Sequence, residues 1–199
     1  MELSERQKEI IEVSLCLIAE KGIQGLTIKN LARKIGFSES AIYRHYENKI
    51  QILVAILNYF QKSTDLTLES DVTANIDAVS RINLMFQKHF EKFSGSPSLV
   101  AVIFSEELFR NEEILIRKVS EIMNSNFEAL TKIILSGQKK GEIRTDIEAS
   151  HIAVMLLGSL RLFVKQWHMS DYSFDLLQKG KELINSFQSL LKTTTNEHS

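Results

Sequence analysis

Apolar residues recur every three or four positions along almost the whole chain, which is the spacing of one face of an α-helix. Ile11, Leu15 and Ile18 show this spacing near the N-terminus, and Leu183 and Phe187 continue it near the C-terminus. A single proline among 199 residues argues against an all-β chain, which would need many turns. We therefore predict an all-α protein of about nine helices.

Composition narrows the class of protein further. Hydrophobic residues make up 44% of the chain and charged residues 25%, which is enough apolar material for a packed core and excludes a largely disordered chain. One cysteine, Cys16, excludes both a disulfide scaffold and a thiolate zinc site within one chain, and the five histidines lack metal-ligand spacing. No apolar run approaches the ~18 residues of a membrane span, and the N-terminus is charged rather than signal-like. We expect a cytoplasmic protein with no metal site and no membrane partner.

Between residues 5 and 60 the pattern predicts four helices separated by short turns. Their expected ranges are 5–21, 28–35, 39–45 and a fourth that begins near residue 48. Gly36 follows the second helix, where glycine readily takes the left-handed conformation that ends a helix, and Ser38 is well placed to cap the third. Two short helices joined by a tight turn and packed on a longer helix form a helix-turn-helix, whose second helix enters the major groove of DNA.

The residues around this turn suit contact with DNA. Lys21–Ile50 contains six Lys or Arg against two acids, whereas the whole chain has a net charge of −1. Ser40, Ala41 and Arg44 would lie on the exposed face of the third helix, with Ile42 as its buried anchor. Polar residues that begin the flanking helices lie where free N–H groups attract phosphate oxygens. The predicted DNA-binding residues are Thr27, Lys29, Ser38, Ser40, Ala41, Tyr43, Arg44, His45, Asn48 and Lys49.

Four motifs follow this arrangement in order and without gaps. They are Ala19-Glu20-Lys21-Gly22, Thr27-x-x-x-Leu31-Ala32, Gly36-Phe37-Ser38 and Ala41-Ile42-Tyr43-x-His45-Tyr46-x-x-Lys49-x-x-x-Leu53. With them, residues from about Arg6 to Leu53 resemble the signature of the TetR/AcrR family of transcriptional regulators. The resemblance implies an N-terminal DNA-binding domain, a C-terminal domain for ligand binding and dimerisation, and repression that a small molecule relieves. It also implies that Arg44 occupies a variable position that commonly reads bases.

The remaining chain is expected to bind an effector. We assign residues 4–60 to the DNA-binding domain, 61–193 to the ligand-binding and dimerisation domain, and 194–199 to a frayed tail. Six of the eleven phenylalanines lie between residues 86 and 127, which suggests an apolar cavity between helices, although a phenylalanine stripe at helical spacing is more often plain core. The effector would be a hydrophobic or amphipathic molecule of unknown identity, and no other cofactor is expected. The predicted lining residues are Phe86, His89, Phe90, Phe104, Phe127, Met155 and Trp167, with His89 as the hydrogen-bonding group.

The last two predicted helices carry apolar stripes that are wider than one intramolecular face needs. They would pair with their symmetry mates as a four-helix bundle, and such a two-fold protein would read a palindromic operator. The alternative is that both helices simply close the core of the monomer. The predicted interface residues are Leu156, Leu162, Phe163, Leu183, Ile184, Phe187, Leu190 and Leu191.

Two other classes of protein compete with a DNA-binding regulator. An enzyme is disfavoured because the chain has no glycine-rich phosphate loop, no H-E-x-x-H motif and no strand-turn-helix context for a serine nucleophile, so we assign no catalytic residue. A helical adaptor would explain the C-terminal stripes equally well but leaves the pattern over Ser38–Lys49 as coincidence. We therefore predict a homodimeric, sequence-specific DNA-binding transcriptional regulator that acts as a repressor.

Overall fold

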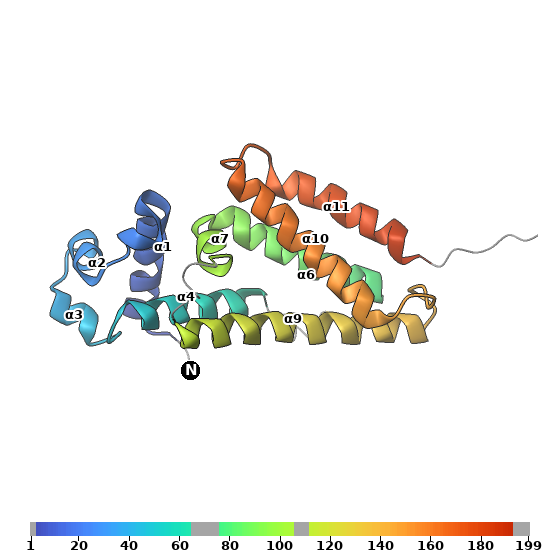
Figure 1. Cartoon of the computed structure of the whole chain (residues 1–199), viewed down its shortest axis with the longest axis horizontal. Coiled ribbons are helices and arrows are strands. Elements are labelled where there is room, and N and C mark those ends of the chain that lie inside the picture. Colours follow the sequence, from blue (N-terminus) through green and yellow to red (C-terminus); the bar gives the residue numbers. More distant parts are fainter. Residues whose placement is uncertain (1–2, 65–75, 106–111, 193–199) are drawn as a thin grey trace, which may run out of the picture. The chain divides into compact units, whose positions relative to one another are not determined.

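The computed structural model describes residues 3–64, 76–105 and 112–192, and within these ranges all regular structure is helical (Figure 1). This confirms the predicted all-α class with about nine helices. None of the described helices is long and apolar enough to cross a bilayer. The helices are α1 (Glu5–Gly25), α2 (Ile28–Ile35), α3 (Glu39–Tyr43), α4 (Lys49–Thr64), α6 (Ala78–Gly95), α7 (Ser98–Ile103), α9 (Glu113–Lys139), α10 (Ala149–Met169) and α11 (Leu176–Leu191).

The chain forms two compact units. The first unit contains the residues up to Ser63 together with Gly95–Ser120, so helix α7 and the start of α9 group with α1–α4. The second unit contains Thr64–Ser94 and the residues from Glu121 onward, and thus α6, most of α9, α10 and α11. The domain boundary that we expected after residue 60 remains a prediction.

In the first unit, α1 is the helix on which α2 and α7 pack. Ser4 begins it with a capping box, in which the Gln7 N–H donates to the Ser4 hydroxyl (3.2 Å) and the Ser4 N–H donates to the Gln7 side chain (3.0 Å). Gly22, just after the predicted end of the first helix, breaks the helical range with φ 66° and ψ 178°. A positive φ of this kind is costly for residues with a Cβ atom, which explains glycine at this position.

In the second unit, phenylalanines of α6 pack beneath α10 and α11. The rings of Phe86 and Phe187 meet edge to face with centroids 5.3 Å apart, and those of Phe90 and Phe163 do so at 5.9 Å. Gly180 on α11 lets the Phe90 ring approach the α11 backbone, because a Cβ atom at this position would lie only 2.6 Å from that ring. Helix α6 is thereby fixed against α10 through one phenylalanine and against α11 through two.

The loop between α9 and α10 holds three helices of the second unit together. The Glu142 carboxylate accepts a hydrogen bond from the Ala78 N–H (2.7 Å), which satisfies a free donor at the start of α6. The Arg144 N–H donates to the carbonyl of Leu191 at the end of α11 (2.9 Å). Gln138 on α9 donates to the carbonyl of Arg144 (2.8 Å) and so anchors the loop from the other side.

Candidate functional site

The turn between α2 and α3 is built by local hydrogen bonds that the sequence encodes. Thr27 caps α2, since its hydroxyl accepts from the Asn30 N–H (3.1 Å). Gly36 ends α2 in the left-handed conformation (φ 85°), as predicted, and its N–H donates to the Ala32 carbonyl (3.0 Å). Ser38 then caps α3, because its hydroxyl accepts from the Ala41 N–H (3.2 Å). These contacts set the direction in which α3 leaves the turn.

Helix α3 is anchored on one side and exposed on the other. Ile42 is fully buried, which confirms its predicted role as the anchor. Tyr43 is 51% exposed, and Ser40 and Arg44 are also exposed. The opposite face of this short helix is therefore presented to whatever the unit binds.

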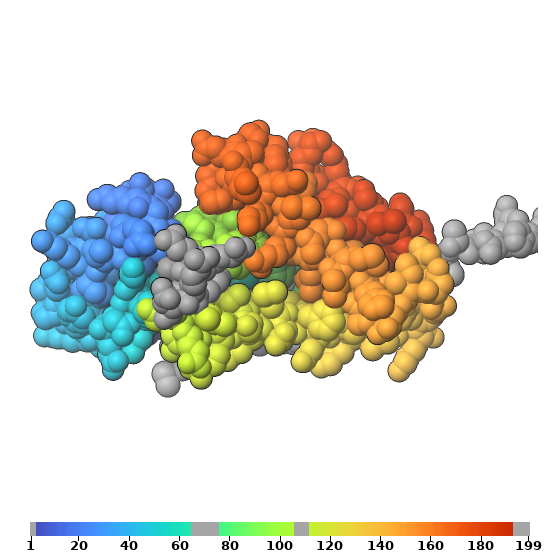
Figure 2. Space-filling view, in the orientation of Figure 1, coloured from blue at the N-terminus to red at the C-terminus, as the bar shows by residue number. Residues whose placement is uncertain are grey.

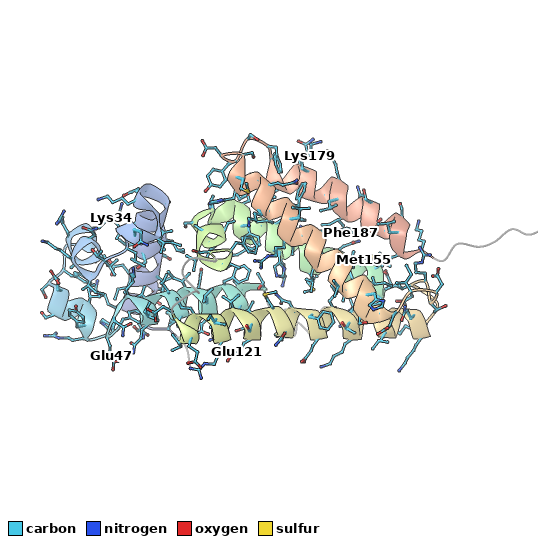
Figure 3. The ribbon with its side chains drawn as sticks, in the orientation of Figure 1. Lys34, Glu47, Glu121, Met155, Lys179 and Phe187 are labelled. Carbon is cyan, nitrogen blue, oxygen red and sulfur yellow. The ribbon has the colours of Figure 1, made fainter. Side chains whose placement is uncertain are left out.

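The start of α4 adds a second exposed polar edge. The Asn48 side chain accepts from the Gln51 N–H (3.0 Å) and thus caps α4, while Lys49 is half-buried beside it. Each of the ten predicted DNA-binding residues lies in the first unit, and each is exposed or half-buried. Lys34 of α2 is not included among these predicted DNA-binding residues. It forms an ion pair with Glu20 of α1 (Figure 3 labels Lys34).

One contact of this unit was not predicted. The Arg6 guanidinium lies 4.3 Å from the centroid of the Phe37 ring, in the middle of the turn, and also pairs with Glu9 at 2.5 Å. This cation–π contact ties the start of α1 to the residue between Gly36 and Ser38. Thirty-one positions separate Arg6 from Phe37, so no periodicity or motif in the sequence could have revealed it.

Comparison with known proteins agrees with this geometry. The family model of bacterial regulatory proteins of the tetR family matches residues 10–56, and the model of the C-terminal region of YsiA-like proteins matches residues 60–191. The chain belongs to the TetR family. It is a DNA-binding transcriptional regulator, and the helix-turn-helix formed by α2 and α3 is the family's DNA-binding element.

Individual TetR-family relatives match over nearly the full length. The fatty acid metabolism regulator protein of Bacillus subtilis (strain 168) is 27% identical over 176 residues, which span 88% of this chain and 90% of the relative. The crystal structure of FadR from Bacillus subtilis in complex with stearoyl-CoA superposes with a TM-score of 0.78 at 24% identity, covering 92% of this chain and 97% of FadR. FadR from Bacillus halodurans gives a TM-score of 0.82 at 19% identity over the full length of both chains.

The predicted effector-site residues differ in element and in burial in this TetR-family structure. Phe86, His89 and Phe90 are buried together in α6, and the imidazole Nδ1 of His89 bonds the Met85 carbonyl at 2.7 Å. Burial lowers the pKa of His89, which favours the neutral ring. Phe104 follows α7 and belongs to the first unit, Phe127 is half-buried on α9, Met155 is exposed on α10, and Trp167 is buried at the end of α10.

The predicted interface residues also divide by exposure. Leu162 and Leu190 are exposed, and Phe163 and Leu183 are half-buried. The other four belong to the core of the protomer itself: Leu156, Ile184, Phe187 and Leu191. The buried residues thus serve the core of the protomer, whereas the exposed ones lie on another face of α10 and α11, and the interface remains a prediction.

A groove of about 140 Å³ lies between α10, α11 and the loop that precedes α10. Met155 and Phe187 are two of its lining residues, and Figure 3 shows them on α10 and α11 respectively. The other lining residues are Arg144, Ile147, Ile152, Leu156, Ser159, Leu190 and Leu191. The groove is mainly apolar, and it adjoins the exposed side chains of the predicted interface.

Proposed function

We propose that this TetR-family protein is a homodimeric repressor, acting in the cytoplasm, which binds a palindromic operator and leaves it when an amphipathic small molecule binds to the second unit. The observation that carries the DNA-binding part is the geometry of α3. It is capped by Ser38, anchored by buried Ile42, and presents Ser40, Tyr43 and Arg44 on its exposed side. A short helix held in this way is suited to insertion into the major groove.

We assign different roles to the exposed residues. Lys29, Ser40 and Arg44 would contribute to base choice, because Arg and Lys pair well with the acceptors of guanine and Ser accepts or donates. Tyr43 and Lys49 would mainly hold phosphates, which fixes the register of the protein on DNA. Thr27 and Asn48 use a side-chain oxygen to cap their own helices and retain donors for a phosphate. Ser38 caps α3 in the same way, and its hydroxyl also forms a hydrogen bond with the Ser40 hydroxyl at 2.9 Å. Ala41 and His45 complete the contact surface.

For the effector, we propose an acyl chain carrying a polar head, of the type that an acyl-CoA represents. Stearoyl-CoA is bound in the FadR structure from Bacillus subtilis, to which this chain is similar. The phenylalanine-rich second unit supports the apolar half of the proposal, since effector sites in proteins are mostly apolar with a few polar groups. Phe86 and Phe90 are tightly packed, so binding there would require their rings to move.

For the dimer, we propose that α10 and α11 pair with their symmetry mates. The exposed apolar side chains of Leu162 and Leu190 support this, because a large apolar group left in water is a frequent mark of an interaction site. α10 and α11 lie side by side on the face shown in Figure 2, in orange and red. A dimer would place two copies of α3 on one operator.

Two substitutions test the assigned DNA contacts. Arg44→Ala should weaken binding to the best operator by roughly 1–3 kcal/mol and weaken random DNA less, since it removes a base contact. Lys49→Ala should weaken binding to all DNA sequences by the same factor and lower the slope of log Kd against log salt concentration by about one unit. Both are measured by fluorescence anisotropy at several salt concentrations, with Lys181→Ala on α11 as the charge-matched control. Equal losses on operator and random DNA for Arg44→Ala would contradict its role in base choice.

The effector proposal is tested with long-chain acyl-CoA. A compound that binds the unit should raise Tm, and a coupling of ~1–3 kcal/mol should weaken operator binding about 5- to 150-fold. A free fatty acid and free coenzyme A serve as partial ligands. If acyl-CoA raised Tm but left operator affinity unchanged, the effector would bind without relieving repression, and that part of the proposal would be wrong.

A further inference from the structure

Gly158 occupies the middle of α10, on the exposed surface of the protomer. Apart from its two chain neighbours and the backbone of its own helix turn, no atom of the described residues lies within 4 Å of the position that a Cβ atom would take there. Glycine is one of the poorest residues in a helix interior, because it loses the most backbone freedom on folding. Glycine at position 158 is therefore unfavourable for α10, and no packing contact within the protomer requires it.

The other glycines inside the helices of the second unit have such a reason. A Cβ atom at Gly137 would come within 2.6 Å of Ala78, and one at Gly180 within 2.6 Å of the Phe90 ring. At both positions a neighbouring element comes too close for a side chain. Close approach is thus the reason for glycine elsewhere in this unit, and at Gly158 the approaching element has to come from outside the protomer.

The surroundings of Gly158 indicate a helix as that element. Met155, Gly158, Leu162 and Met169 lie on one exposed face of α10, at steps of three, four and seven residues. Met155 is 52%, Leu162 59% and Met169 75% exposed. A seam that repeats in steps of three and four is the pattern by which one helix packs along another. The apolar side chains of this face are exposed to solvent in the protomer.

We infer that the two α10 helices of the dimer cross antiparallel and in direct contact at Gly158, an inference that rests on the homodimer proposed above. In a two-fold dimer, a residue at the symmetry axis meets its own copy, and residues equally far before and after it meet each other. The absence of a side chain at the crossing lets the two backbones come closer than the usual 8–10 Å between helix axes. Gly158 is the residue of the seam that permits this.

The charges on the face favour the antiparallel direction. Lys165 lies seven residues after Gly158, and His151 lies seven residues before it, with its Nε2 3.9 Å from the Glu148 carboxylate. An antiparallel crossing brings Lys165 opposite this His151–Glu148 pair, where the carboxylate attracts it. A parallel crossing would instead bring Lys165 toward its own copy, which costs energy by like-charge repulsion.

The groove between α10 and α11 fits the same arrangement. Val154 and Leu162 lie four residues before and after Gly158, so the partner's Leu162 would lie opposite Val154. Met155 of the seam is also one of the residues that line this groove of about 140 Å³. A partner helix packed on the seam would therefore lie along the edge of the groove.

Disulfide trapping tests the crossing point. Gly158→Cys is made in a Cys16→Ser background, the full-length protein is oxidised with diamide, and cross-linking is read on a non-reducing gel. Two Cys residues bridge only when their Cα atoms are within about 7 Å. We expect almost complete conversion of Gly158→Cys to a covalent dimer. In the matched control Leu162→Cys, each copy lies about 6 Å along the helix from the crossing, so the two are about 12 Å apart and should not cross-link.

The outcomes separate this inference from the proposed dimer. Cross-linking of Leu162→Cys as fast as Gly158→Cys would show parallel helices and overturn the inference. If neither variant cross-links while light scattering shows a dimer, the homodimer stands and the crossing lies elsewhere. If the unmodified protein is a monomer at the concentrations used for operator binding, both the inference and the proposed homodimer are wrong. A second variant, Gly158→Leu, should stay helical by circular dichroism and raise the dimer Kd at least about tenfold.

Discussion

The buried imidazole of His89 makes the stability of the second unit depend on pH. Burial lowers its pKa in the folded state, whereas the unfolded chain takes up a proton near pH 6.5. The unfolded state therefore binds more protons below that pH, so the free energy of unfolding should fall as the pH drops below about 6.5. The loss should approach about 1.4 kcal/mol per pH unit.

Urea unfolding between pH 7.5 and 5.5 measures this loss. His89→Leu should remove most of the pH dependence, while His151→Gln, which changes an exposed ring on α10, should keep it. An unchanged pH dependence in His89→Leu would mean that other groups cause it.

The buried hydroxyl of Tyr46 lowers the stability of the first unit. Its ring is buried in the first unit, and its hydroxyl has no hydrogen-bond partner among the described residues. An unsatisfied buried hydroxyl destabilises a fold by about 1–3 kcal/mol, and removing it leaves the ring packing intact. Tyr46→Phe should therefore raise the free energy of unfolding by about 1 kcal/mol and leave operator affinity unchanged. A destabilised Tyr46→Phe variant would show that the hydroxyl has a partner in solution.

At the scale of elements, the start of α6 depends on a residue far away in the sequence. The Glu142 carboxylate accepts from the Ala78 N–H at 2.7 Å. A charge-assisted bond to the positive end of a helix is worth about 1–2 kcal/mol when partly buried. Glu142→Ala should lower the urea midpoint accordingly, whereas Glu148→Ala, which removes an exposed carboxylate that contacts the neighbouring Ser150 and His151, should have little effect. Equal effects of the two would contradict the capping role.

The sequence predicts the elements best where their ends are determined locally. Gly36 and Ser38 mark the end of α2 and the start of α3 because each acts through its own backbone neighbourhood. The third helix is two residues shorter than predicted, because the N–H groups of His45 and Tyr46 both bond the Ile42 carbonyl in a closing turn. Periodicity alone could not reveal that turn.

The effector residues could not be settled from sequence for a different reason. A phenylalanine at helical spacing looks the same whether it lines a cavity or fills a core. Phe86 and Phe90 are both fully packed against aromatic rings of α10 or α11, whereas Met155 of the same predicted set is exposed. Which side of a helix meets which neighbour depends on tertiary contacts such as that between Gly180 and Phe90.

At the scale of the whole molecule, exposure decides which substitutions test the dimer. Leu162→Glu with Leu190→Glu should give folded monomers that lose operator binding, because both side chains are exposed in the protomer and a buried charge at an interface is costly. Phe187 is unsuited to such a test, since it is 4% exposed and its replacement would damage the core. Leu177→Glu on another face of α11 is the control that should remain dimeric. Light scattering measures the mass of each variant in solution. If the double variant remained a dimer with unchanged operator affinity, the interface would lie elsewhere.

Selection of DNA from a random duplex pool tests the central claim most directly. A dimer that presents two copies of α3 should enrich an inverted repeat whose half-site centres lie about one helical turn, or a multiple of it, apart. The enriched duplex should bind the full-length protein with an affinity that survives excess competitor DNA and falls steeply with salt. A pool that shows no enriched sequence, or binding that competitor DNA abolishes, would contradict the account of this protein as a sequence-specific regulator.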